Sequence, residues 1–472
     1  MASEEELAAV DDRLEAALAL PPPRTRSDLS AMLNRLFWSL GSFVSSYGFR
    51  LLSNVVLTRL LDPHIFGIMV VVQAMRLGIE LLTDVGIEQN IVRHEEGLEP
   101  RFFNTAWTMQ IIRGVGLSAL FMALSPLFAR FYDIDVRIFM AIAFAPLINS
   151  LHSTSIFALV KNLEVKKRTL FEFKAEFTGF VAAVTLALIS PSVWAMVFGT
   201  LIAIATRSAL SYRLPHPPHK LMLDRGYVKE IMIFGRWIMI SSLVMFAAGN
   251  LDRLTLGKVA PLALLGIYGL ARAIADIPAL MARRLTYQII FPMLAAARSK
   301  GDDSLLANIG PQRLRLVLAG AMIMGLGAAS ADWPIAILYD PRYAQAGWML
   351  SLLLFASWIS ILSNLNEGLL MGSGRPSYES GANVLRFVIL ALGLWFGYRV
   401  AGFAGAICAL IASEFGRYLF VAIGQRRMNL SFFRQDALAT LVMIGASAVW
   451  IAMRHALGLG APWDMLGLAL KS

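Results

Sequence analysis

The chain is a succession of apolar runs, each about as long as a membrane-spanning helix. Crossing a hydrocarbon core of about 30 Å takes about 20 residues of helix. Only 16% of the 472 residues are charged and the mean hydropathy is +0.63, whereas soluble domains carry about 25% charged residues. We therefore predict an all-α polytopic membrane protein with runs near 36–58, 64–88, 105–129, 137–160, 175–190, 192–212, 230–251, 262–282, 314–338, 345–371, 379–398, 401–424 and 435–456.

The connections between these runs alternate in their content of lysine and arginine. Connections after even-numbered runs hold many basic residues, and those after odd-numbered runs hold few. The positive-inside rule therefore predicts that the N-terminus and the basic connections lie in the cytoplasm. The net charge of +10 is spread over many short loops, so nucleic acid is not an expected partner.

Composition also predicts how the chain divides. The first residues are acidic and then proline-rich, without the apolar core of a signal peptide, which indicates a disordered cytoplasmic tail or, alternatively, a partner-binding tail. Three prolines in the connection RLPHPPHKLMLDRGYVK indicate a hinge. At the C-terminus, 457–472 is either a truncated fourteenth span or an interfacial piece. The predicted parts are a tail (1–35), a six-helix lobe (36–213), a cytoplasmic linker (214–229), a second six-helix lobe (230–428) and extra C-terminal helices (429–472).

An internal match supports two related lobes. Shifted by 199 residues, TRLLDPHIFGI (58–68) lies over GKVAPLALLGI (257–267). The shift pairs Arg59 with Lys258 and Gly67 with Gly266, at equivalent places between the first two spans of each lobe. Parallel repeats related by an axis along the membrane normal are common in secondary transporters. We therefore expect a pseudo-two-fold axis along the membrane normal.

Four segments together carry a family resemblance: LTRLLDPHIFGIMVVV, ALVKNLEVKKRTLFE, NLDRLTLGKVAPLALLGIYGLA and LLMGSGRPSYES. In this order they resemble the polysaccharide-transport family of the multidrug/oligosaccharidyl-lipid/polysaccharide flippase superfamily, over about residues 30–430. The resemblance implies export of undecaprenyl-diphosphate-linked oligosaccharides across the bacterial inner membrane for O-antigen, capsule or exopolysaccharide. It also implies contact with membrane lipids and with a polysaccharide polymerase or export machinery. The chain departs from the superfamily's larger layout at its end, where no full fourteenth span is visible.

Three arginines on different predicted spans are the candidate substrate site. Arg50, Arg76 and Arg272 are each expected about 12–18 Å below the outer surface, from a rise of about 1.5 Å per residue. A charge at the bilayer centre costs at least about 2.5–3.5 kcal/mol, so such side chains face protein or water. Guanidinium groups bind phosphate oxygens bidentately and keep their charge when desolvated. The resemblance implies that these residues line a central cationic cavity for the diphosphate headgroup.

Acidic residues lie beside two of these arginines. Glu80 and Asp276 follow Arg76 and Arg272 at i,i+4, so each pair is able to neutralise itself in place. We also consider that Glu80, Asp84 and Asp276 couple transport to H⁺ or Na⁺, or hold the arginines between substrates. In the second lobe, three further charged residues are predicted to brace the helices, with substrate contact as the alternative: Arg386, Glu414 and Arg417.

Other classes of function fit less well. Neither a metal nor a cofactor is expected, because Cys408 is the single cysteine, the six histidines are scattered, and no GxxxxGK[ST] loop occurs. A drug antiporter of the same superfamily would need an apolar or acidic cavity. A membrane-embedded enzyme acting on polyprenyl-linked sugars would need more than the few outer carboxylates at Asp133, Asp135, Asp332 and Asp340. We therefore predict a transporter and not an enzyme.

Overall fold

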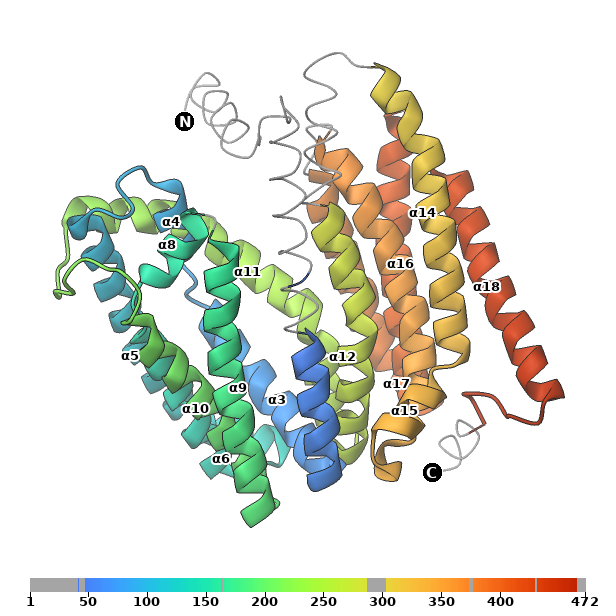
Figure 1. Cartoon of the computed structure of the whole chain (residues 1–472), viewed down its shortest axis with the longest axis horizontal. Coiled ribbons are helices and arrows are strands. Elements are labelled where there is room, and N and C mark those ends of the chain that lie inside the picture. The colour runs from blue at the N-terminus through green and yellow to red at the C-terminus, as the bar shows by residue number, and fades with distance from the viewer. Residues whose placement is uncertain are drawn as a thin grey trace. The chain divides into compact units, whose positions relative to one another are not determined.

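The computed structural model describes residues 41, 47–162, 164–286, 303–372, 377–428 and 431–464 (Figure 1). Within these residues, eight helices are long and apolar enough to cross a membrane, or ten if each of two bent helix pairs forms one span. The prediction of an all-α polytopic membrane protein is therefore confirmed. The predicted tail 1–35 and residues 465–472 of the predicted C-terminal piece lie outside the described residues.

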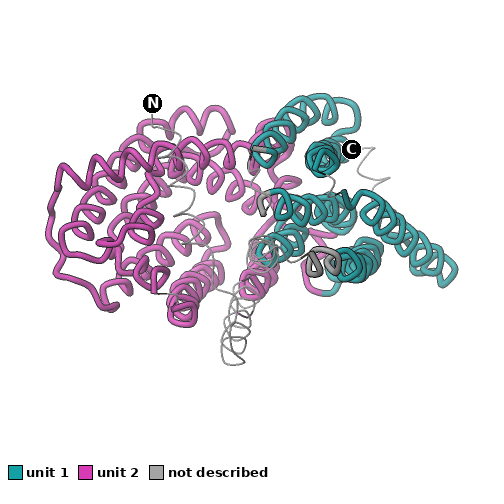
Figure 2. The backbone as a smooth tube through the Cα atoms, turned by 90° about the horizontal axis from the view of Figure 1, so that it is seen from above, with its two compact units in different colours: residues 1–36, 271–337, 345–472 teal, residues 37–270, 338–344 magenta. Residues whose placement is uncertain are grey.

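The chain forms two compact units (Figure 2). The N-terminal unit comprises 37–270 together with 338–344, and the C-terminal unit comprises 271–337 and 345–472. The boundary falls within one helix, Leu262–Leu285. The assignment of 214–229 as the linker between two six-helix lobes remains a prediction.

The described helices of the N-terminal unit follow one another with short connections, apart from the longer connection 212–224. They are a helix over 47–60, α3 (Pro63–Leu81), α4 (Ile87–Arg93), α5 (Pro100–Tyr132), α6 (Val136–Ile142), α7 (Phe144–Ser150), α8 (Ser155–Lys161), α9 (Val165–Ile189), α10 (Val193–Ser211), α11 (Arg225–Val259) and the first part of α12 (Leu262–Leu285). The 3-10 helix η2 (Pro341–Tyr343) also belongs to this unit.

The C-terminal unit is built from longer helices. It contains the rest of α12, then α14 (Asp303–Ala329), α15 (Asp332–Leu338) up to 337, α16 (Ala346–Gly372), α17 (Ser377–Arg427) and α18 (Phe433–Ala456). The helix α16 lies at the core of this unit, since 72% of the residues in an apolar 18-residue stretch of it are buried. Its Trp348 and Trp358 side chains are fully enclosed.

The second predicted span ends earlier than the apolar run 64–88 suggests. α3 begins as expected, with the Asp62 carboxylate accepting a hydrogen bond from the His64 N–H and Pro63 in the first turn. It ends at Leu81, because the Asp84 side chain accepts a hydrogen bond from the Gly86 N–H and Gly86 has a φ of 60°. This local turn competes with the helix, and a second short helix, α4, follows the break.

Two other predicted spans are bent. The run 137–160 forms α6, α7 and α8, with a bend of 62° before α8. Serine side chains satisfy the backbone at this break, since Ser153 Oγ accepts a hydrogen bond from the Ser155 N–H. The run 314–338 likewise becomes α14 and α15, at an angle of 59°. Hydropathy detects these runs, but it does not detect the polar side chains that divide them.

Contacts between α3 and the start of α12 support the internal repeat. A Cβ on Gly67 would overlap the Leu262 carbonyl oxygen, and a Cβ on Gly266 would overlap the Pro63 carbonyl oxygen. These contacts are reciprocal under the 199-residue shift, and Gly269 packs on its own counterpart Val70. Reciprocal contacts of this kind mark a two-fold relation. Both glycines are required, because the helix backbones touch here.

Two helical hairpins, one in each unit, are packed in the same way, through small residues between their antiparallel arms. α9 and α10 turn back on each other around Pro191, where Gly179 and Gly199 pack against Ala203 and Ala183. α17 is likewise two antiparallel arms that turn at Ala401 and Gly402, whose backbone is not helical. Its arms touch through Gly397 and Gly405. Small residues allow both pairs of arms to approach closely.

Candidate functional site

Arg76 is held in the C-terminal half of α3 by polar neighbours. Its Nη1 lies 2.6 Å from Glu80 Oε1, and its Nε donates to Gln73 Oε1 at 2.8 Å. Gln73 in turn donates to Thr200 Oγ1 on α10 at 3.2 Å. The predicted i,i+4 pair between Arg76 and Glu80 is therefore present, and both side chains are largely buried.

The break after α3 gathers a second group of charges. Arg113 on α5 donates from Nε to Thr83 Oγ1 at 3.1 Å and from Nη2 to the Glu80 carbonyl oxygen. Asp84 accepts a hydrogen bond from Ser242 Oγ on α11 at 3.2 Å. A guanidinium at the C-terminal end of α3 interacts favourably with the negative end of the helix dipole. The sequence analysis missed Arg113, although a lone arginine inside the run 105–129 was a signal for it.

Arg50 has a partner that its sequence neighbours do not reveal. Its Nη2 lies 3.0 Å from Glu176 Oε1 on α9, 126 residues away in the chain. Phe49 packs edge-on against Phe173 and Phe180, which holds the helix over 47–60 against α9. The Arg50 side chain is 65% exposed and that of Glu176 is 27% exposed.

One turn before Glu176, α9 carries a second ion pair that the sequence analysis missed. Arg207 on α10 donates from Nε and Nη2 to the two oxygens of Glu172, both at 3.0 Å. Its Nη1 also donates to Asn149 Oδ1 on α7 at 3.3 Å. The side chains of Arg207 and Glu172 are 27% and 29% exposed. The spacing of Glu172 and Glu176 at i,i+4 was the available sequence signal.

In the C-terminal unit, Arg272 and Asp276 form the second predicted i,i+4 pair. Arg272 Nε lies 3.0 Å from Asp276 Oδ1 on α12. The Ser357 hydroxyl on α16 donates to the carbonyl oxygen of Ala275 in the same turn. Arg272 is thus paired within its helix, as Arg76 is in the other unit.

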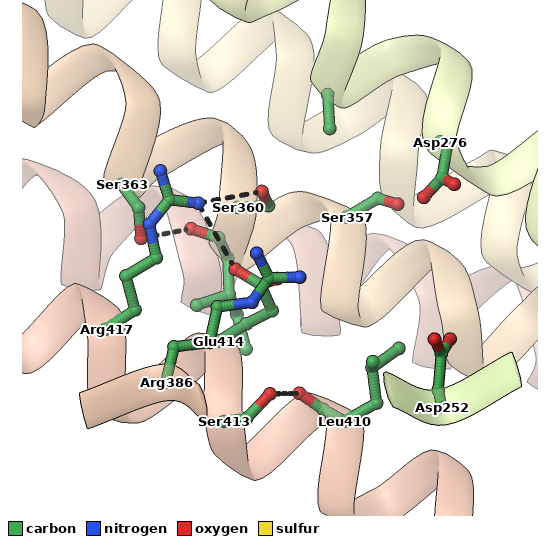
Figure 3. A network of polar contacts seen from close by, with 12 residues as sticks. Asp252, Asp276, Ser357, Ser360, Ser363, Arg386, Leu410, Ser413, Glu414 and Arg417 are labelled. Carbon is green, nitrogen blue, oxygen red and sulfur yellow. Dashed lines mark hydrogen bonds and ion pairs between the residues drawn. The ribbon is translucent and has the colours of Figure 1, made fainter. Parts of the chain in front are cut away.

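Arg386, Glu414 and Arg417 form one buried network in the C-terminal unit (Figure 3). Arg386 Nη2 lies 2.8 Å from Glu414 Oε1. Arg417 lies 3.5 Å from Glu414 and binds both oxygens of Glu367 on α16, at 2.9 and 2.6 Å. It also donates to Asn364 Oδ1 at 3.0 Å. Arg417 and Glu367 are only 7% and 2% exposed. Bracing of the lobe remains a prediction that fits this burial.

A further buried ion pair fastens α18 to the C-terminal unit. Arg313 on α14 lies 2.6 Å from Asp436 on α18. The same carboxylate accepts hydrogen bonds from Asn366 Nδ2 at 2.8 Å and Tyr418 Oη at 3.0 Å. The sequence analysis missed this pair, because its members are far apart in the chain and near span ends.

The three arginines of the predicted cavity therefore each have a carboxylate partner. Arg50 and Arg76 belong to the N-terminal unit and Arg272 to the C-terminal unit, so their meeting in one cavity remains a prediction. Among the described residues, no group of three or more histidine, cysteine, aspartate or glutamate side chains is able to hold a metal ion.

The fold and these charges define a class: an all-helical protein with several membrane spans, which carries paired arginines and carboxylates inside its spans. Residues 56–346 match the family model described as polysaccharide biosynthesis protein, and the chain belongs to that family. This membership confirms the resemblance predicted from the four sequence segments.

Two relatives cover most of the chain. The teichuronic acid biosynthesis protein TuaB of Bacillus subtilis is 22% identical over 382 residues, which cover 78% of each protein. The lipopolysaccharide biosynthesis protein WzxC of Escherichia coli is 23% identical over 438 residues, which cover 89% of this chain and 86% of WzxC.

Solved structures show the same fold at low identity. The lipid II flippase MurJ, in an inward closed conformation, matches with a TM-score of 0.67 at 8% identity and covers 89% of this chain and 93% of its own. An inward-facing MATE family multidrug resistance transporter of the MOP superfamily matches with a TM-score of 0.58 at 14% identity and covers 80% and 94%. The predicted two-lobe polytopic fold is therefore confirmed.

Proposed function

We propose that this protein is a flippase that moves undecaprenyl-diphosphate-linked oligosaccharide repeat units across the bacterial inner membrane. The glycan serves exopolysaccharide, capsule or O-antigen biosynthesis. Family membership supports the proposal, as do relatives named for teichuronic acid, lipopolysaccharide and succinoglycan biosynthesis. The protein works by alternating access of its two lobes, while the prenyl tail stays in the lipid.

The observation that carries the proposal is the Arg76–Glu80 pair in the last two turns of α3. A desolvated guanidinium with a neutralising carboxylate is stable without a ligand, and it is able to exchange that carboxylate for a phosphate. The diphosphate therefore binds Arg76, and Arg50 and Arg272 complete a cationic cavity. Each arginine returns to its own carboxylate once the substrate leaves.

Glu80, Asp84 and Asp276 couple this exchange to an ion gradient. Protonation of Glu80 or Asp276, or Na⁺ binding to it, frees the paired arginine for the diphosphate. Asp84 lies at the break between α3 and α4, where its carboxylate binds Ser242. Interrupted membrane helices are common at coupling-ion sites.

The chain lies with its N-terminus in the cytoplasm. The basic start of α9, from Lys166 to Lys174, lies at the inner leaflet, where anionic lipids attract polybasic segments. The lipid-linked glycan enters from this side, and the polymerase or export machinery receives it on the other.

Reconstitution tests the proposal directly. Proteoliposomes that contain an undecaprenyl-diphosphate-linked oligosaccharide should flip it with the wild-type protein and lose flipping with Arg76→Ala. The matched control is Arg93→Ala, which removes an exposed ion pair with Glu230. Flipping by Arg76→Ala at the wild-type rate would overturn the cavity. Flipping that persists after all ion gradients collapse would overturn the coupling.

Cells give an independent test. Deletion of the gene should make lipid-linked repeat units accumulate on the cytoplasmic side of the membrane. Accumulation on the periplasmic side would instead indicate a polymerase.

A further inference from the structure

α9 carries a row of charges that the proposed cavity does not use. Glu172 and Glu176 lie one turn apart on it, and each binds an arginine from a different neighbouring helix, Arg207 and Arg50. Asn149 extends the row through its hydrogen bond with Arg207. We call this group the α9 ladder: Asn149, Glu172, Glu176 and Arg207.

The exposure of the ladder requires a polar surrounding. Between 27% and 29% of each charged side chain in the ladder is exposed, and Arg50, the partner of Glu176, is 65% exposed. Contact of such a charge with hydrocarbon costs at least about 2.5 kcal/mol, so intramembrane charges face water or protein. α9 itself has 25 residues, which is long enough to span, yet it is not among the eight described helices that are apolar enough to count as spans. The exposed side of the ladder therefore faces water or lipid headgroups.

The C-terminal unit contains a counterpart of the Arg207–Glu172 pair that is sealed, which here means almost completely buried. Arg417 follows Ala401 by as many residues as Arg207 follows Pro191. Both arginines bind a glutamate bidentately and an asparagine, and Asn364 and Glu367 have the roles of Asn149 and Glu172. The sealed version holds its helices together with at most 7% of either side chain exposed, so structural support alone does not account for the open version.

The chemistry of the ladder distinguishes its ligand from the diphosphate. Its two carboxylates outnumber its one guanidinium group, so its net negative charge repels an anion, whereas its acceptors and donors fit the hydroxyl groups of a sugar, which donate and accept hydrogen bonds. On the basis of the proposed flippase function, we propose that the α9 ladder is a sugar-binding subsite that contacts the oligosaccharide of the lipid-linked substrate and selects for it. The diphosphate is left to Arg50, Arg76 and Arg272.

The test compares two substrates in proteoliposomes. One is the lipid-linked repeat unit that accumulates in cells without this protein, and the other is the same lipid trimmed by exoglycosidases to its first sugar. The double variant Glu172→Gln/Arg207→Gln removes both charges and keeps a polar side chain at each position. It should reduce flipping of the full repeat unit about tenfold, as expected from one or two lost hydrogen bonds, with little change for the trimmed lipid. Arg93→Gln, which removes an exposed ion pair with Glu230, should leave both rates unchanged.

The remaining outcomes overturn the inference. Equal losses on both substrates at an unchanged melting temperature assign the ladder to the diphosphate. Equal losses with a lower melting temperature assign it to structural support, and wild-type rates on both substrates leave it no role in transport. Should the double variant fail to fold, Glu172→Gln alone applies the same comparison. Wild-type protein that flips neither lipid overturns the proposed function itself, and the subsite with it.

Discussion

The α9–α10 hairpin and the α17 hairpin place an arginine at the same distance from their turns, but they surround it differently. Arg207 and Glu172 keep over a quarter of their side chains exposed, whereas Arg417 and Glu367 are almost completely enclosed. Glu176 and Arg386 also match in position, with opposite charge. One hairpin thus offers its ion pairs to a ligand, and the other uses them inside its core.

The difference teaches that a charge in a membrane helix has two stable environments. A sealed pair must satisfy nearly every donor and acceptor within the protein, as Arg417 does with Glu367, Asn364 and Glu414. An open pair lets water complete its hydrogen bonds and can exchange partners. The N-terminal unit combines its open pairs with the broken span α3–α4, and we assign the contact with the sugar to it.

The largest expected effect comes from removing one partner of the sealed pair. Glu367→Ala leaves Arg417 without its bidentate carboxylate in a buried site, which costs about 3–5 kcal/mol. The melting temperature in detergent should fall sharply. The matched variant in the open pair, Glu172→Ala, should cost under about 1 kcal/mol, because water replaces the lost partner. Equal falls in melting temperature for the two variants would contradict the proposed difference between the hairpins.

A second comparison concerns the tightness of the two hairpins. Gly405→Ala places a Cβ against the Gly397 carbonyl group, which cannot yield, and should destabilise the protein by about 1–3 kcal/mol. Gly199→Ala meets the Ala183 Cβ at 2.6 Å, so a small separation of α9 and α10 relieves it at lower cost. Thermal melts of both variants measure the difference, and a larger loss for Gly199→Ala would reverse the assignment of the tighter hairpin.

Much of this arrangement could be predicted from the sequence, because it is local. Hydropathy located the spans, Asp62 and Pro63 marked the start of α3, and the i,i+4 spacing of Arg76 with Glu80 and Arg272 with Asp276 gave two ion pairs. Long-range partners could not be predicted. Arg50 finds Glu176 and Arg417 finds Glu367 only because distant helices pack together.

Salt should change the coupling energy of the ion pairs differently in the two hairpins, and this effect should be smaller than those above. A double-mutant cycle on Arg50 and Glu176 should give about 0.2–1 kcal/mol at low salt and less in 1 M salt, because exposed pairs are screened. The cycle on Arg386 and Glu414 should change little with salt, since both side chains are buried. Equal salt dependence would show that water reaches both.

The smallest effect is expected in the segment 338–344, which is outside the spans. Hydrogen bonds from the Arg342 side chain and backbone hold the pKa of Asp340 below its ordinary value. A lowered pKa contributes stability above the unfolded-state pKa of about 3.9, and that stability is lost as the pH falls through the folded value. Hydrogen exchange at the Tyr343 amide should therefore be protected at pH 5 and lose part of that protection below about pH 3.9, beyond the intrinsic pH dependence of exchange. Asp340→Asn should remove this dependence, and its persistence in that variant would refute the assignment.

Thiol accessibility tests most directly the contrast between the open Arg207–Glu172 pair and the sealed Arg417–Glu367 pair. In a Cys408→Ser background, Asn149→Cys and Asn364→Cys place one thiol beside Arg207 and one beside Arg417. A charged, membrane-impermeant thiosulfonate, applied from both sides of native membranes, should modify the cysteine at 149 and leave the one at 364 unreacted. The full lipid-linked repeat unit should slow the reaction at 149. Equal reaction at both positions, or no reaction at 149, would contradict the account.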